Sequence, residues 1–352
     1  MASLRDVARL AGVSLATASR ALAQPDRVAP ERRARVERAA ADLGYRPQRR
    51  TLHGGPGGHA AHGTSAAGGA GRVIGILVPD LQNPFFAGVV KGIQLQARTV
   101  GISVLIADTD ENPRIEAEAF ARLDRQVAGL VLCSPRMSDQ ALTALPLDVP
   151  TVLINRESAH LRAVLVDNVD GMRQALAHLH ALGHRRIAYA GGQPGSWSDA
   201  QRRQGLEAAA GALPDVELVQ LGHFPPVFAG GVAAGDLVPV SGATAVVAHN
   251  DLMALGILDR LRQRGTAVPD RVSVVGFDDI PAATHMTPAL TTVAVPLHRL
   301  GRAAVELLLD ETPEPDADAV TVPVSLVVRS STAPRLAPLS AVGRTPDGPE
   351  DV

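Results

Sequence analysis

The chain has 352 residues, of which 46% are hydrophobic and 20% are charged. This length exceeds what one compact core usually holds, so it predicts two or three domains. No apolar run reaches the roughly 18–20 residues that a membrane span requires, and the N-terminus has no apolar signal core, so we expect a cytoplasmic protein with no membrane partner. The single cysteine, Cys133, excludes a disulfide framework, and we expect no metal site and no cofactor.

Charge is distributed unevenly along the chain. Residues 1–53 contain 11 arginines and five acidic residues, a balance of +6, whereas the remainder carries −8. A basic N-terminal part joined to an acidic body is typical of a chain whose first domain meets a polyanion. Solvated basic helices are a common alternative origin of such a charge.

The first 50 residues predict three short helices, at residues 4–11, 15–22 and 30–43. Gly12 can end the first helix, Ser14 can cap the second, and Pro30 suits the first turn of the third. Helix, glycine turn and helix within about 20 residues is helix-turn-helix geometry. The alternative is an ordinary small helical bundle with no DNA role.

In helix-turn-helix geometry the second helix enters the major groove with its N-terminal residues toward the bases. Leu15 and Ala16 would then contact thymine methyl groups, and Arg20 would make a bidentate contact to guanine. Short hydroxyl side chains that suit phosphate oxygens lie beside them: Ser14, Thr17 and Ser19.

Beyond the head, the chain changes character twice. Residues 54–71 are rich in glycine and have no large apolar side chain, which predicts a flexible linker. Apolar strands then alternate with helices, at residues 73–78, 102–107, 129–133, 151–154, 163–166, 187–190, 245–248 and 272–275. This pattern predicts parallel sheets covered on both faces, and the number of strands favours two α/β lobes.

These patterns give a complete domain assignment. Residues 1–50 form a helix-turn-helix headpiece, 51–71 a Gly-rich linker, 72–334 the body, and 335–352 a disordered tail. Within the body we expect lobe 1 at about 72–162 and 291–321, and lobe 2 at about 163–290 and 322–334.

Ordered motifs run along almost the whole chain to about Pro334. The head contributes residues 6–22, Arg27 and the run Leu43-Gly44-Tyr45-Arg46-Pro47. The body contributes residues 78–80, 83–86, 166–168, 182–187, 250–256, 275–279, 287–292 and 328–331. Together they resemble the LacI/GalR family of bacterial repressors. The resemblance implies a sequence-specific regulator and adds three DNA-contact candidates: Leu4, Arg27 and Tyr45.

The resemblance also implies a two-lobed, periplasmic-binding-protein-like body with an effector in the cleft between the lobes, where the strands have their carboxyl ends. Phe85 and Phe86 resemble an aromatic wall, Arg202 an arginine that reaches effector oxygens, and Asn250 with Asp278 a polar pair. The remaining effector-binding candidates are Asn155, Ser196, Ser198 and Phe224, the last resembling an aromatic that stacks on the ligand. Aromatic faces with Asn, Asp and Arg suit a polyhydroxylated ring, so we expect a sugar.

Each of these candidates has an ordinary structural alternative. Phe85 and Phe86 could be plain core, Asp278 could cap a helix, and Arg202 could lie on the surface. Trp197 is the only tryptophan of the chain, and a lid over the cleft is one role for it.

The chain departs from the family pattern directly after Pro47. The family usually continues with a hinge helix whose leucine wedges into the minor groove, whereas here only residues 48–53 precede the glycines. Either Leu52 replaces that leucine or Arg50 enters the minor groove. The long linker predicts weaker dependence on operator half-site spacing, and Ala29 supplies no side-chain cap for the third helix.

Other functions and mechanisms stay open at this point. Residues 191–195 follow a strand but lack the spacing of a phosphate loop, which disfavours an enzyme. A transport-type sugar-binding protein would share the lobes but not the head. Within the regulator interpretation, two heads must meet two half-sites of a pseudo-palindromic operator, so we expect a homodimer with contacts around residues 86–98. The effector acts as inducer or corepressor, and we favour an inducer.

Overall fold

The computed structural model describes residues 4–13, 17–18, 21, 29–43, 73–310 and 319–335. The chain divides into two compact units, Met1–His59 and Ala60–Val352, each of which is described by itself. The predicted linker, residues 51–71, and residues 336–352 of the predicted tail lie outside the described residues. Among the helices that are described, none is both long and apolar enough to cross a membrane.

The first unit contains helices α1 (Leu4–Ala11) and α3 (Pro30–Asp42), close to the predicted ranges. Between them, Thr17, Ala18 and Ala21 are helical, in agreement with the predicted second helix. Small apolar side chains from all three segments form one core: Val7, Ala8, Ala11, Ala18, Ala21, Val36, Ala39 and Ala40. The small size of these residues lets short helices pack closely around them.

Backbone geometry explains how the first unit turns. Gly12 ends α1 with φ of +61°, a conformation that glycine adopts without strain. The Arg35 guanidinium of α3 donates to the carbonyl oxygens of Ala11 and Gly12, which ties the two helices together. At the start of α3, Ala29 makes no side-chain cap hydrogen bond, as predicted.

The first lobe of the second unit has a six-stranded parallel sheet in the order β11-β5-β4-β3-β1-β2. Its strands are β1 (Val73–Val78), β2 (Ser103–Asp108), β3 (Leu130–Cys133), β4 (Thr151–Ile154), β5 (Arg162–Val166) and β11 (Ala319–Val322). Its helices are α4 (Pro84–Thr99), α5 (Pro113–Leu123), α6 (Asp139–Thr143) and α12 (Leu297–Leu309). The central strands β3 and β4 are completely buried, as expected for a sheet covered on both faces.

The second lobe repeats this architecture with the order β12-β10-β9-β8-β6-β7. Its strands are β6 (Arg186–Gly191), β7 (Glu217–His223), β8 (Ala245–Ala248), β9 (Ser273–Asp278), β10 (Thr291–Ala294) and β12 (Ser325–Val327), and only the β10–β12 pair is antiparallel. Its helices are α7 (Asn168–Ala181), α8 (Trp197–Gly211), α9 (Phe228–Leu237), α10 (Asp251–Gln263) and α11 (Ala282–His285). The predicted fold class, with two α/β lobes, is therefore confirmed.

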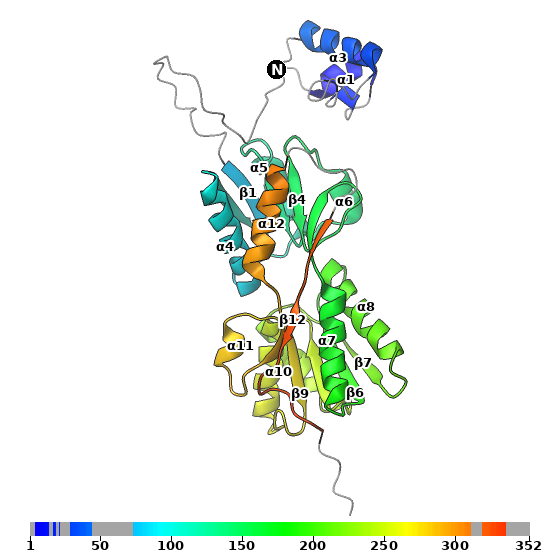
Figure 1. Ribbon diagram of the computed structural model, residues 1–352, viewed down its shortest axis with the longest axis vertical. Coiled ribbons are helices and arrows are strands. Elements are labelled where there is room, and N and C mark those ends of the chain that lie inside the picture. The colour runs from blue at the N-terminus through cyan, green and yellow to red at the C-terminus, as the bar shows by residue number, and fades with distance from the viewer. Residues whose placement is uncertain are drawn as a thin grey trace, which may run out of the picture. The chain divides into compact units, whose positions relative to one another are not determined.

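The predicted lobe boundaries are wrong at two strands. β5 pairs with β4 and β11 in the first sheet, although we had assigned residues 163–166 to the second lobe. β10 pairs with β9 and β12 in the second sheet, although we had assigned it to the first. The chain passes between the lobes after β5, after β10 and after β11, as Figure 1 shows. Apolar periodicity identifies a strand but not the sheet that it joins.

Glycines bring neighbouring helices of each lobe into close contact. A Cβ atom at Gly92 of α4 would lie 2.5 Å from the carbonyl oxygen of His298 in α12, so only glycine fits there. In the second lobe, a side chain at Gly231 of α9 would overlap the backbone of Met253 in α10. Figure 1 shows α4 and α12 side by side. This packing holds the helices rigidly against the sheets that carry the cleft.

Candidate functional site

Polar side chains gather where the parallel strands of both lobes end. Ser134 directly follows β3, Asn155 follows β4, His249 follows β8, and Asp278 is the last residue of β9. These residues line one cavity between the lobes, here called the inner cavity, together with Asn83, Phe85, Phe86, Glu111, Arg136, Ser198, Arg202, Pro226 and Asn250. Its volume is about 30 Å³, which holds water but no sugar ring.

Arg202 of α8 lies at the centre of the inner cavity wall and is only 3% exposed. Its Nε donates to Asn168 Oδ1 at 2.9 Å, one terminal nitrogen donates to the carbonyl oxygen of His249, and the other lies 3.3 Å from Asp278 Oδ1. The guanidinium carbon also lies 3.7 Å from the centre of the Phe277 ring. A buried arginine held in this way presents a fixed fork to a ligand, because every partner restricts its orientation.

Asn168 connects this cluster to the first lobe. It begins α7 directly after the chain leaves β5, and its Nδ2 donates to Asn155 Oδ1 at 2.9 Å. Asn155 Nδ2 in turn lies 3.4 Å from Ser134 Oγ. A continuous path of hydrogen bonds therefore runs from the end of β3 through Asn155 and Asn168 to Arg202 and Asp278, and any ligand that exchanges with it acts on both lobes at once.

Phe85 and Phe86 supply the apolar wall of the inner cavity. Their rings meet edge to face, with centroids 5.1 Å apart and planes at 88°. Asn83 fixes the start of α4 because its side chain accepts a hydrogen bond from the Phe85 amide at 3.0 Å. Both rings are 4% exposed, so they serve as core and as cavity wall together.

The backbone around the inner cavity is strained at several non-glycine residues. Glu111, Ser134, Asn155 and Asp278 have φ values of 56°, 43°, 54° and 115°. Such conformations cost about 1–3 kcal/mol each and persist only where the surroundings fix them, which is typical of ligand sites. Four such residues around one cavity indicate that the surrounding structure fixes the directions of their side chains despite the cost in backbone energy.

Burial sets the protonation of the groups in and behind the cavity. It raises the pKa of Asp278 to about 7, although Arg202 opposes the shift. It lowers the pKa of His249 to about 4, so this imidazole is neutral at physiological pH. Burial alone would raise the pKa of Asp199, but contacts from His249, the Gly192 amide and the Tyr189 hydroxyl lower it below its ordinary value. Asp199 is therefore an ionised, fully engaged carboxylate behind the cavity.

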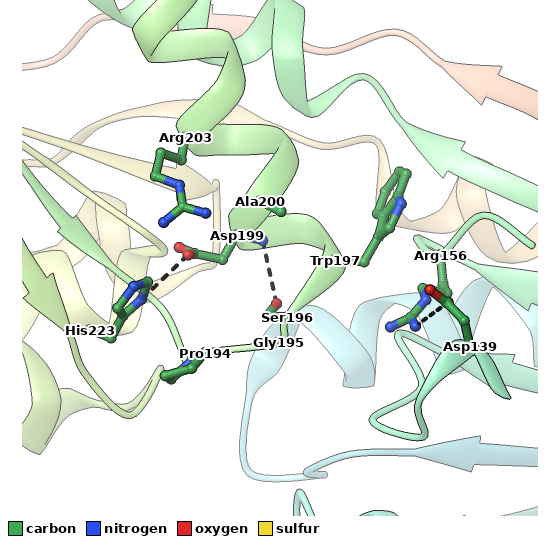
Figure 2. Close-up of a pocket in the computed structure, with 10 residues that line it drawn as sticks. All are labelled: Asp139, Arg156, Pro194, Gly195, Ser196, Trp197, Asp199, Ala200, Arg203 and His223. Carbon is green, nitrogen blue, oxygen red and sulfur yellow. Dashed lines mark hydrogen bonds and ion pairs between the residues drawn. The ribbon is translucent and has the colours of Figure 1, made fainter. Parts of the chain in front are cut away.

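A second and larger cavity, here called the outer chamber, adjoins the first. Its volume is about 400 Å³, and it is lined by Asp139, Arg156, Pro194, Gly195, Ser196, Trp197, Asp199, Ala200, Arg203 and His223. Figure 2 shows these side chains, with the start of α8 between the Arg156–Asp139 pair and His223. Within the described parts of the chain, no group of three His, Cys, Asp or Glu side chains is arranged to hold a metal ion.

The structure brings seven of the nine effector-binding candidates to the inner cavity. Ser196 lines the outer chamber instead, where it caps α8. Phe224 lines neither cavity and is half-buried against the apolar core of the second lobe, so its stacking on a ligand stays a prediction. Arg202 and Asp278 are both buried and paired with each other, so neither is a surface residue nor a simple helix cap.

Sequence reasoning missed several residues of the inner cavity wall: Asn83, Glu111, Ser134, Arg136, Pro226 and His249. Most of them lie within a few residues of the end of a strand. Because carboxyl ends of parallel strands share one edge, the first polar residue after each predicted strand was a signal that would have found Ser134 and His249.

The predicted DNA contacts are described only in part. Leu4 is the first residue of α1, and Thr17 is half-buried in the second helix. The others lie outside the described residues: Ser14, Leu15, Ala16, Ser19, Arg20, Arg27, Tyr45, Arg50 and Leu52. Their roles stay predictions.

Comparison with known proteins identifies both units. Residues 3–48 match the model for "Bacterial regulatory proteins, lacI family", and residues 176–332 match the "Periplasmic binding protein-like domain". The transcriptional repressor CytR of Escherichia coli K12 is 33% identical over 318 residues, which cover 88% of this chain and 89% of CytR. The chain belongs to the lacI family of bacterial regulatory proteins. It is a DNA-binding transcriptional regulator and not an enzyme, which confirms the interpretation of its sequence.

Solved structures of lacI-family proteins resemble this chain over both units. The lac repressor dimer bound to operator and the anti-inducer ONPF gives a TM-score of 0.68 at 28% identity, covering 94% of this chain and 99% of the repressor chain. The complex of the regulator CelR with cellobiose gives a TM-score of 0.67 at 31% identity, with coverage of 94% and 100%.

Proposed function

We propose that this protein is a homodimeric repressor that acts in the cytoplasm on a pseudo-palindromic operator and is released from it by a sugar. The observation that carries the proposal is the hydrogen-bonded path from Asn155 through Asn168 to Arg202 and Asp278 in the wall of a cavity between two lobes. It offers donors and acceptors beside the aromatic faces of Phe85 and Phe86, which suits a ring that bears hydroxyl groups.

The related structures support the same proposal. The lac repressor is a dimer bound to operator, and CelR is bound to cellobiose. A sugar that binds between the lobes must separate them from the closed arrangement, because the inner cavity now holds only about 30 Å³. Sugar binding therefore shifts the equilibrium between two lobe arrangements. This shift changes operator binding only if the two arrangements differ in their affinity for the operator.

Operator affinity with and without sugar tests the proposal. Operators are first selected from a random duplex library with the full chain, and affinity is then measured by fluorescence anisotropy at one fixed salt concentration. We expect at least one of ribose, xylose, glucose, galactose, cellobiose and maltose to weaken operator binding. If none changes affinity by more than about twofold, the sensor hypothesis fails; a sugar that strengthens binding would replace inducer by corepressor.

The Arg202→Leu variant is the matched control. It removes three donors from the inner cavity without touching the residues of the first unit. Where circular dichroism shows that the variant is folded, we expect it to retain operator binding and to lose the sugar response. Equal responses of variant and native chain would contradict the assigned site.

A further inference from the structure

The outer chamber has the size of a ligand site and is separate from the inner cavity. Its volume of about 400 Å³ falls within the roughly 300–1,000 Å³ typical of small-molecule pockets. Both lobes contribute to it: Asp139 and Arg156 come from the first, and Trp197 and Arg203 come from α8 in the second (Figure 2). An occupant would therefore contact both lobes.

The chamber offers one aromatic face and several fixed polar groups. Trp197 is half-buried at the first turn of α8, which leaves part of its indole accessible. Arg156 is 6% exposed, and its terminal nitrogen lies 2.7 Å from Asp139 Oδ1. Its terminal nitrogens also donate to the carbonyl oxygens of Pro135 and Met137, which fix the position of the guanidinium.

The charges of the chamber wall nearly cancel. Arg156 and Arg203 stand against Asp139 and Asp199, and the Asp199 carboxylate also lies 3.6 Å from His223 Nδ1. A phosphate or carboxylate ligand would require an excess of cations, which the chamber does not supply. The accessible Asp139 carboxylate and Arg203 guanidinium instead present acceptors and donors, which a neutral ring with several hydroxyl groups can satisfy.

The outer chamber and the inner cavity share a wall. Ser196 Oγ, in the chamber, lies 3.1 Å from Ser198 Oγ, in the inner cavity. Asp199, in the chamber, lies 3.2 Å from Nδ1 of His249, in the inner cavity. The two spaces therefore lie directly beside each other, within reach of one elongated molecule.

We propose that the outer chamber is a second saccharide subsite, in which Trp197 stacks on a sugar ring. The natural effector is then a neutral saccharide of at least two rings, with one ring in the inner cavity and the next in the outer chamber. This inference rests on the proposed function, because it assumes that the inner cavity binds a sugar.

Trp197 makes the test specific, because it is the only tryptophan in the chain. Its fluorescence reports the outer chamber directly, whereas isothermal calorimetry on the full chain reports total binding. The probes are glucose, galactose, ribose and xylose on one side and cellobiose, maltose, lactose and melibiose on the other. We expect one disaccharide to bind at least about tenfold more tightly than either of its component sugars and to shift Trp197 emission.

Two variants separate the subsites. Trp197→Ala is expected to reduce the affinity for that disaccharide about tenfold while leaving the affinity for its component monosaccharide unchanged, and Trp197→Phe is expected to restore part of the loss. Arg202→Leu is expected to weaken both. Circular dichroism of each variant confirms that it is folded.

The possible failures are distinguishable. If a monosaccharide binds as tightly as every disaccharide and emission does not change, the second subsite is refuted while the proposed function stands. If glucose 6-phosphate binds more tightly than every neutral sugar, the neutral ligand class is refuted. If calorimetry detects no binding of any probe, the proposed function and this inference fall together.

Discussion

Replacing Arg202 by leucine should destabilise the protein by an amount that depends on pH. The variant loses the hydrogen bonds to Asn168 and to the His249 carbonyl at every pH, and it loses the ion pair with Asp278 only where that carboxyl is ionised. Hydrogen bonds that involve a charged group contribute about 1.5–3 kcal/mol each. Removal of one partner of a buried ion pair costs about 3–5 kcal/mol.

The sign follows from the pKa of Asp278. Burial raises this pKa from its ordinary value of 3.8 to about 7, and Arg202 lowers it from a still higher level. The stability that Asp278 contributes is therefore complete below about pH 4 and is lost as the pH rises through about 7 in the native chain. Without Arg202 the pKa of Asp278 is higher still, so stability continues to fall to higher pH. Each further unit of this pKa lowers the free energy of unfolding by another 1.36 kcal/mol. At pH 5.5 the Asp278 carboxyl is protonated in both proteins. The decrease in the free energy of unfolding caused by Arg202→Leu should therefore be about 2 kcal/mol larger at pH 8.5 than at pH 5.5.

Urea denaturation followed by Trp197 fluorescence at the two pH values measures this difference. Arg203→Leu is the matched control, because Arg203 is the next residue of α8 and its 4.0 Å contact with the half-exposed Glu207 is weak. Its effect should stay within about 0.5 kcal/mol at either pH. The double variant Arg202→Leu with Asp278→Asn should show no pH-dependent difference from Asp278→Asn alone. An equal loss for Arg202→Leu at pH 5.5 and pH 8.5 would refute the reasoning.

Two further predictions concern packing and protonation. Gly92→Ala places a methyl group against the His298 backbone and should destabilise the chain by about 1–3 kcal/mol. Gly211→Ala places a methyl group that meets no atom within 4 Å and should stabilise the chain by about 0.4–1 kcal/mol. Urea denaturation measures both variants, and a more stable Gly92→Ala than Gly211→Ala would contradict the contact between the helices. His184 is buried with Ser273, and burial lowers its pKa below 6.5, so its contribution to stability is present above that value and is lost as the pH falls through the folded pKa. The drop in melting temperature between pH 7.5 and pH 5.0 should therefore be smaller in His184→Gln than in the native chain, and an unchanged drop would exclude this role.

The sequence by itself determined the secondary structure and the family of this protein. Apolar periodicity gave the helices at residues 4–11 and 30–43 and the strands of both lobes, because 3.6-residue and continuous apolar patterns are local properties. The resemblance to the family, and not periodicity, gave seven of the thirteen residues that line the inner cavity, among them Asn155 and Asp278.

Only the tertiary structure decided which sheet each strand joins and what lies beside the cleft. β5 and β10 have the same apolar character as their neighbours, so their assignment depends on which strands they pair with, β4 and β11 for β5 and β9 and β12 for β10. Phe224 carries an aromatic ring that suits a ligand as well as a core, and packing placed it on the core. Arg156, Trp197 and Arg203 line the outer chamber from two lobes, and no local sequence pattern encodes which distant segments face each other across a cleft.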